Sequence, residues 1–397
     1  MISLEKISKV SFLTLACMLW AQRFFNYVFV AADKVLGTSP FMATTGSVAL
    51  LVILALASIR YLSARIRPTD ITFIVIVLSL YFYAPAARYV SDGDYERFTN
   101  LFLMSLPLYL IGVSMDISQL KTLFRILSVA SIFTMAYYNL VFIHNTGYAG
   151  GAEFTKDNMS TSYGLLLMTI YMTWYTFSHF DWKSVFSWID LVSVLLGGLA
   201  MSMLGTRGPL VAFVAFVVLY VIIFKIPQKK LLYGSVFLII LIVFMVWMDD
   251  ILMFLASKAV DLGFSDRIFT LLISGEFHQD GNFGRNWIFQ TLIEALGESP
   301  IYGYGIFGSF QFVNIYAHNI FLEILFSFGY LIGGLIIIFG IFSAIKAFLN
   351  DVTDDERGFL LVLIGSGVLG LMFSSAFYLN AAFFMFVGYC VQLAYRK

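Results

Sequence analysis

Three residues of this 397-residue chain carry side chains that could handle an anion and a proton: Arg207 in LGTRGPL, Arg285 in NFGRNW and His318 in YAHNIF. Arg207 stands just before Pro209, which suits the first turn of a helix. The glycines around it leave backbone N–H groups open at the positively polarised helix end, so we expect an anion to be attracted there. The alternative is an arginine at the membrane interface that binds lipid head groups.

His318 stands at the start of a predicted helix, where its imidazole could accept a proton. The amino end of a helix disfavours a protonated imidazole, so we expect His318 to be neutral near pH 7. The alternative is a helix cap or an interfacial residue. Asn319 and Glu323 share a helix face, whereas Glu323 lies about 140° from His318 around the helix. Glu323 is therefore poorly placed to orient the histidine.

Two further patterns are similar to a dinucleotide site and to a metal site, but their sequence context does not support either. The glycines of GYGIFG match the dinucleotide fingerprint G-x-G-x-x-G, but no βαβ unit surrounds them, so we interpret them as loop residues that permit close backbone approach. Asp92 and Asp94 form a D-x-D pair of the kind with which metal-dependent sugar transferases hold a divalent ion. So short a pattern arises easily by chance, and we predict neither a metal nor a cofactor.

The elements that position these residues are predicted to be membrane-spanning helices. Hydrophobic residues make up 60% of the chain and charged residues 12%, which excludes an ordinary soluble enzyme. The 24 basic and 24 acidic residues cancel, which argues against a nucleic-acid partner. We predict an all-α polytopic membrane protein with about twelve spans, near 10–31, 41–59, 70–87, 99–117, 122–143, 160–179, 185–204, 208–225, 231–248, 319–345, 358–375 and 379–395.

The distribution of basic residues orients the spans. With the amino terminus inside, 15 of the 24 basic residues fall in the tail segments and the connections on the cytoplasmic side, so both termini are predicted to be cytoplasmic. The chain is then a single integral membrane domain, 1–397, with a long outer loop at 249–318 between spans 9 and 10. Within this loop, 285–296 is predicted to be a short amphipathic helix that Gly297 ends. Its apolar face consists of Ile288, Leu292, Ala295 and Leu296, and it lies on the membrane surface or against the bundle.

Three motifs taken together carry a family resemblance. GTRGPL at the start of a span, GRNWIFQTLIEALGESPIYGYGIFGSF in the outer loop and AHNIFLEILFSFGYLIGG entering the next span resemble the O-antigen polymerase and O-antigen ligase superfamily of bacterial envelope assembly. The resemblance covers 200–345 in motif detail and the remainder in topology. It implies a GT-C-like helical fold in the bacterial inner membrane. It also implies undecaprenyl-diphosphate-linked glycans as donor and acceptor, a site facing the periplasm, and a chain-length regulator as a further partner.

The resemblance also assigns roles to residues. Arg207 and Arg285 match the family arginines that are proposed to hold the diphosphate, and His318 matches the histidine that is proposed to activate the acceptor. Fixed guanidinium groups can stabilise a leaving diphosphate without a metal, and a neutral imidazole can take the proton of the attacking hydroxyl. Other residues are expected along the donor or acceptor path: Arg23, Arg88, Arg97, Arg267, Tyr304, Asn319 and Glu323.

Two alternatives stay open at this point. Polymerase and ligase share their chemistry, and the polymerase is favoured because Tyr316 and Ala317 stand where the ligase form is expected to carry a second histidine before the His-Asn pair. A secondary transporter would also suit twelve helices, with Arg23, Asp190 and Glu323 as intramembrane coupling groups. Against the transporter, we find no repeat that relates 1–200 to 201–397.

Overall fold

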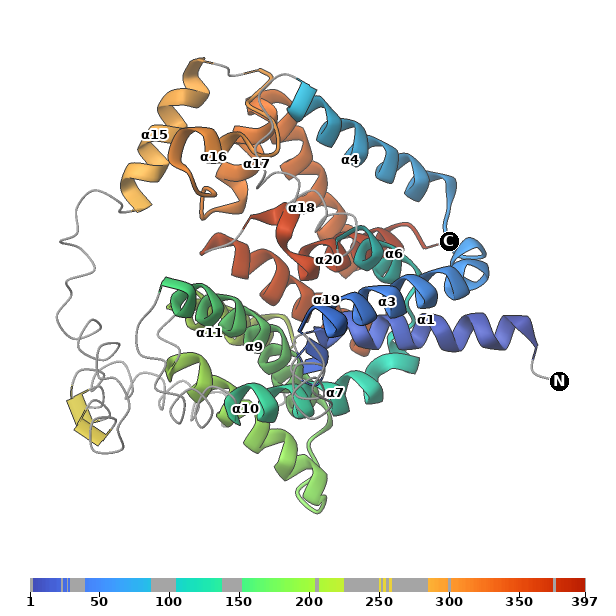
Figure 1. The fold of residues 1–397 in the computed structure, drawn as a ribbon. Helices are drawn as coiled ribbons and strands as arrows, with labels where there is room; N and C mark the ends of the chain where they lie inside the picture. Colours follow the sequence, from blue (N-terminus) through green and yellow to red (C-terminus); the bar gives the residue numbers. More distant parts are fainter. Residues whose placement is uncertain are drawn as a thin grey trace. The chain divides into compact units, whose positions relative to one another are not determined.

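In the computed structural model, the regular secondary structure of the described residues is entirely helical. It describes residues 3–22, 24–26, 28, 40–86, 105–137, 152–203, 207–224, 250, 253–254, 257–258, 285–298, 301–373 and 376–396. Within these residues there is no strand (Figure 1), in agreement with the predicted all-α class. The chain forms two compact units, one of 1–131 with 288–397 and one of 132–287.

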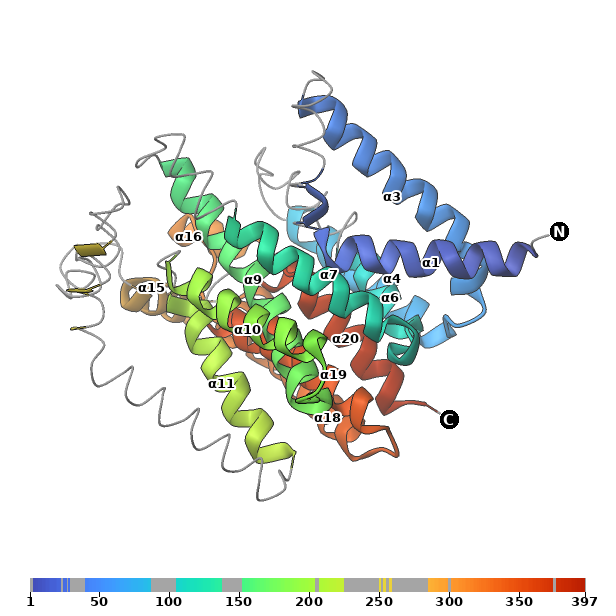
Figure 2. The ribbon, with the colours of Figure 1, turned by 90° about the horizontal axis from the view of Figure 1, so that it is seen from below.

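The amino-terminal half of the first unit is built from apolar helices, all of them long except α6. They are α1 (Leu4–Trp20), α3 (Pro40–Ser63), α4 (Pro68–Ala86), α6 (Leu106–Ser114) and the start of α7 (Ile117–Tyr137). The first span, predicted near 10–31, begins earlier, because the Ser3 hydroxyl accepts the Lys6 N–H and starts α1 at Leu4. Helix α1 ends at Trp20, and the described residues 22, 24–26 and 28 are again helical. Helix α1 packs against α3 (Figure 2).

The carboxyl-terminal half of the same unit contains the predicted site histidine. Its elements in chain order are α15 (Arg285–Glu298), α16 (Gly308–Val313), α17 (Ile320–Phe328), a π-helical turn (Gly329–Gly333), α18 (Gly334–Leu349), α19 (Asp354–Leu363), a second π-helical turn (Ile364–Leu369), two 3-10 turns (Gly370–Met372 and Phe377–Leu379) and α20 (Ala381–Ala394). Helices α15, α16 and α17 lie side by side (Figure 1), and one apolar cluster joins them.

The second unit consists of the end of α7 with three further helices. They are α9 (Ala152–His179), α10 (Val185–Met203) and α11 (Arg207–Ile223), and α9 packs against both others. Gly197 of α10 lies so close to Thr169 of α9 that a Cβ there would overlap the threonine side chain. The predicted span 231–248 lies outside the described residues, so the count of twelve spans stays a prediction.

Hydropathy and exposure agree with a membrane environment. Two described helical segments, Ile117–Tyr137 and Ile320–Leu349, are long and apolar enough to cross a bilayer by length and composition, although the second is interrupted at Gly329, and several shorter helices are also apolar. Helix α18 exposes a stripe of large apolar side chains: Leu335, Ile338, Phe339, Phe342 and Ile345. A patch of this kind is disfavoured in water and is stable against lipid chains. The chain therefore has the character of a membrane protein.

The tenth predicted span is broken rather than continuous. Gly329 has φ 74°, outside the helical range, and ends α17. After it, the π-helical turn lies directly on α17, because a Cβ on Gly333 would stand 2.9 Å from the Ile324 carbonyl oxygen. The prediction of one helix over 319–345 is therefore corrected to two helices. The physical reason is that only glycine adopts both the backbone of Gly329 and the contact of Gly333 without strain.

Glycines also set the crossing of α6 and α20. A Cβ on Gly112 would overlap the Met385 carbonyl oxygen and the Tyr389 nitrogen, and a Cβ on Gly388 would overlap the Tyr109 carbonyl oxygen. The two helix backbones are therefore in direct contact, which small residues allow in membrane helix pairs.

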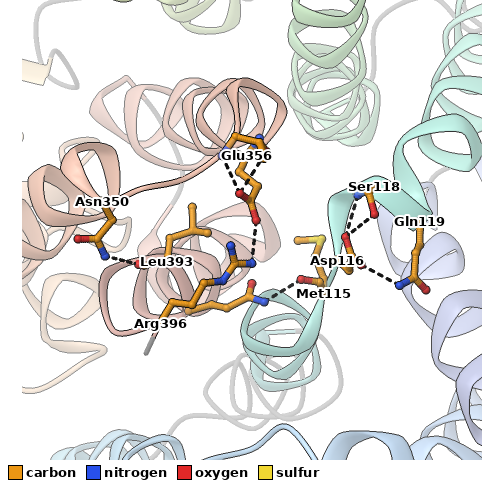
Figure 3. A network of polar contacts seen from close by, with 10 residues as sticks. Met115, Asp116, Ser118, Gln119, Asn350, Glu356, Leu393 and Arg396 are labelled. Atoms are coloured by element: carbon orange, nitrogen blue, oxygen red, sulfur yellow. Dashed lines mark hydrogen bonds and ion pairs between the residues drawn. The ribbon is translucent and has the colours of Figure 1, made fainter.

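A network of polar side chains joins the carboxyl end of α20 to α6, α19 and the residue after α18 (Figure 3). The Asn350 amide donates to the Leu393 carbonyl at 2.6 Å, and the Gln392 amide donates to the Met115 carbonyl at 2.9 Å. Arg396 pairs with Glu356 at 2.7 Å. Because the last carbonyls of a helix have no partner within the helix, the Asn350 amide supplies one to the end of α20 at Leu393 and Ala394.

Candidate functional site

His318 occupies a strained backbone position between α16 and α17. Its φ is 54°, the left-handed conformation that a non-glycine residue adopts at a cost on the order of 1 kcal/mol. Its side chain is 9% exposed, and its ring lies against that of Tyr316, with 4.4 Å between centroids. Residues in such a conformation persist where their surroundings hold them, and they concentrate at functional sites.

Asn319 determines where α17 begins. Its side-chain oxygen accepts the N–H groups of Phe321 at 3.0 Å and Leu322 at 3.1 Å, which makes Asn319 the N-cap of the helix. His318 is therefore the residue before the cap, and its imidazole belongs to the loop rather than to the helix. The expected place of Asn319 along a substrate path stays a prediction.

Glu323 fixes the same loop from inside the protein. Its side chain is 2% exposed, and one carboxylate oxygen accepts the Ser309 hydroxyl at 3.0 Å. The other accepts the backbone N–H of Ala317 at 2.6 Å. Because Ala317 immediately precedes His318, Glu323 contacts the histidine loop through the main chain, although around the helix it lies about 140° from His318. Glu323, one of the groups on which the transporter alternative rests, is thus engaged in holding a loop.

The segment Gly303–Gly305 lies on the broken end of α17. The N–H of Tyr304 donates to the Phe326 carbonyl at 2.8 Å, and that of Gly305 donates to the Ser327 carbonyl at 2.9 Å. Gly303 has φ 64°, and a Cβ there would overlap the backbone of Phe326, Phe328 and Gly329. The expected close backbone approach is confirmed for Gly303, whereas Gly308 begins α16 and a Cβ there would meet the side chains of Tyr304 and Phe326.

Helix α15 packs against this assembly through the face predicted from the sequence. Ile288, Leu292, Ala295 and Leu296 are all buried in one cluster with residues of α16, α17 and the loop between them. The Tyr304 hydroxyl donates to the Ala295 carbonyl at 2.7 Å, and its ring stacks on Phe326. These contacts show that Tyr304 joins α15 to α17, which its expected place along a substrate path did not anticipate.

Both predicted arginines begin helices. Arg285 is the first residue of α15 and falls in the second unit, which ends at Trp287, whereas α15 from Ile288 on belongs to the first unit with His318. Arg207 is the first residue of α11, as its neighbour Pro209 suggested, and α11 belongs to the second unit. The gathering of Arg207 and Arg285 with His318 would join two units and stays a prediction.

The remaining expected residues fall outside the described part of the chain. They are Arg23, Arg88, Arg97 and Arg267, together with Asp92 and Asp94. Among the described residues, no group of three or more His, Cys, Asp or Glu side chains is arranged to hold a metal ion.

Two partners of Glu323 were not anticipated from the sequence. Ser309 lies in α16, and the Tyr378 side chain, fully buried in the turn before α20, lies against the same carboxylate. No local pattern marks either residue, because Tyr378 is brought to Glu323 across 55 residues of sequence by the packing of α20. The only sequence feature that could have drawn attention to Ser309 is its place directly after the glycines of GYGIFG.

One family model matches the part of the chain that contains the three motifs. Residues 192–339, from within α10 to within α18, match a family model described as O-antigen ligase. The matched segment contains Arg207, Arg285, His318 and Glu323. Comparison with curated proteins gives no match, and comparison with solved structures gives none either.

Proposed function

Residues 192–339 match the O-antigen ligase family model, and on this support we propose that the chain is a member of the O-antigen polymerase and ligase superfamily that polymerises glycan repeat units at the bacterial inner membrane. The donor and the acceptor are oligosaccharides carried on undecaprenyl diphosphate, and transfer takes place on the periplasmic face. The observation that carries the proposal is the placement of His318, held in a left-handed backbone just before α17 inside the matched segment.

The proposed reaction needs one proton acceptor and a stabilised leaving group. A sugar hydroxyl of the acceptor attacks the anomeric carbon of the donor, and its proton passes to the imidazole of His318. The bond from the anomeric carbon to the diphosphate oxygen breaks, and undecaprenyl diphosphate leaves with the electron pair. Attack from the side opposite the leaving group inverts the anomeric configuration.

Arg207 and Arg285 are proposed to stabilise the leaving diphosphate, which gains negative charge in the transition state. Guanidinium groups donate paired hydrogen bonds to phosphate oxygens, and fixed donors of this kind can replace a metal ion. Each arginine begins a helix, where the main-chain N–H groups and the helix dipole also favour an anion.

A ligase that transfers the finished chain to lipid A core is the second candidate, because the two enzymes would share this chemistry. The polymerase is favoured by the residues before His318. Tyr316 and Ala317 occupy the places where a ligase is expected to carry a further histidine, and the Tyr316 ring lies against the imidazole.

The test supplies membranes that contain this protein with undecaprenyl-diphosphate repeat units alone, and the products are separated by size. We expect ladders of increasing chain length without lipid A core, and we expect them to persist in the presence of a metal chelator. A single transfer that requires core would identify a ligase. Glycan that only crosses the membrane would support a transporter, and loss of ladders on chelation would implicate Asp92 and Asp94.

A further inference from the structure

We propose that Glu323 is a positioning residue that sets the place of the His318 imidazole through the backbone N–H of Ala317. The inference rests on the proposed role of His318 as the proton acceptor. The carboxylate does not need to reach the imidazole, because it fixes the peptide that leads directly into His318.

Hydrogen bonds hold the residue before His318 and the residue after it. On the amino-terminal side, the Ala317 N–H donates to Glu323 at 2.6 Å. On the carboxyl-terminal side, Asn319 is bound to the first turn of α17 by two hydrogen bonds. Because Glu323 lies on that same first turn, residues 317–323 form a closed loop of contacts with His318 between its anchors. Because the backbone on both sides of His318 is held, the direction in which its side chain leaves the main chain is fixed.

The chemistry of Glu323 indicates a hydrogen-bonding task rather than a packing task. It is surrounded by the apolar cluster that includes Ile320, Ile324 and Phe307, where a leucine would fill the space without the cost of removing a carboxylate from water. The carboxylate instead accepts from Ser309 and Ala317 and lies against Tyr378. Through these partners it ties the loop to α16 and to the turn before α20.

Two substitutions separate the hydrogen bond from the bulk of the side chain. In Glu323→Gln the amide oxygen can still accept the Ala317 N–H while its NH₂ group donates to the Ser309 oxygen, so we expect turnover within a few-fold of wild type. In Glu323→Leu the Ala317 N–H loses its acceptor, and we expect kcat to fall about a hundredfold with little change in KM, as small displacements of a reacting group do. Glu294→Leu, on the exposed face of α15, is the matched control and should leave kcat unchanged.

A second readout follows the imidazole without relying on activity. The chain has four histidines, so ¹³C-histidine labelling in detergent gives a simple spectrum, in which His318→Gln identifies the His318 signal. We expect the Tyr316 ring to shift this signal, Glu323→Leu to move it to the value of an exposed histidine, and Glu323→Gln to preserve it. If Glu323→Leu does not fold, Glu323→Asp replaces it, because its shorter carboxylate cannot reach Ala317 and should produce the same movement.

An unmoved His318 signal together with unchanged kcat in Glu323→Leu, or in Glu323→Asp, would overturn the positioning role. A different result would contradict the proposed function: the His318→Gln variant would keep its glycan-elongating activity. In that case the spectra of the Glu323 variants would still show whether Glu323 positions the His318 imidazole.

Discussion

At the scale of single residues, the proposed role of His318 depends on its backbone conformation as well as on the chemistry of its imidazole. The left-handed conformation, the contact with Tyr316 and the N-cap at Asn319 together set its orientation. Histidine and asparagine enter this conformation more readily than most residues, and β-branched residues are strongly disfavoured there. The choice of replacement therefore decides whether a variant tests chemistry or folding.

His318→Asn should abolish chain elongation while leaving thermal stability close to wild type. Asparagine tolerates the left-handed backbone but cannot act as the base, and loss of a general base typically lowers the rate by 10² to 10⁴. Glycan ladders on gels and thermal unfolding in detergent check the two parts. His318→Val is the contrasting variant and should lose stability as well; ladders of normal length from His318→Asn would exclude His318 as the base.

At the scale of elements, glycines determine how helices meet. Gly329 and Gly333 fold the apolar run 320–349 into two helices, and Gly303 lets a loop lie on the carbonyls that this break exposes. In a membrane, a broken helix is stable only when other groups satisfy the exposed carbonyls, and the N–H groups of Tyr304 and Gly305 do this here.

Gly388→Ala should destabilise the protein by about 1–3 kcal/mol, the usual range for overpacking, because its methyl group would overlap the backbone of α6. Thermal unfolding in detergent measures the effect. Gly340→Ala in α18 is the control, since a Cβ there meets nothing within 4 Å and alanine favours a helix. Equal stability of the two variants would show that α6 and α20 do not cross as described.

At the scale of the whole molecule, the stability of the fold depends on the ionisation of Glu356, in the polar network at the carboxyl end of α20. Partial burial raises the pKa of Glu356, but the hydrogen bonds from Thr353 and the pair with Arg396 together bring this pKa below its ordinary value of 4.5. A carboxyl group whose pKa is lowered by folding stabilises the fold above its unfolded pKa, and that contribution disappears as the pH falls through the folded value.

We therefore expect wild-type protein to lose more stability than Glu356→Gln when the pH is lowered from neutrality to below 4.5. The difference should be about 1 kcal/mol or less, because Arg396 is half exposed. Unfolding temperatures across this pH range measure it, with the exposed Glu294→Gln as control. A steeper acid loss in Glu356→Gln than in wild type would contradict the sign.

The proposed reaction also requires the two units to bring Arg207 and His318 to one substrate. Cysteines at both positions should be joined by a short bifunctional thiol reagent in native membranes, and a periplasmic reagent that does not cross the bilayer should label position 318. Cys17 and Cys390 are first replaced by serine, because Cys17 is no more buried than position 318. Absence of cross-linking, or labelling from the cytoplasmic side alone, would contradict the proposed site.

The sequence alone determined the features that depend on local pattern. Hydropathy identified the apolar helices, the spacing of Ile288, Leu292, Ala295 and Leu296 defined the buried face of α15, and the motif around His318 located the candidate base. Only the tertiary structure decided features that join distant segments: the helix break that Gly333 allows against Ile324, and the placement of Tyr378 beside Glu323. Periodicity reports which face of a helix is apolar, but not which backbone or side chain covers it.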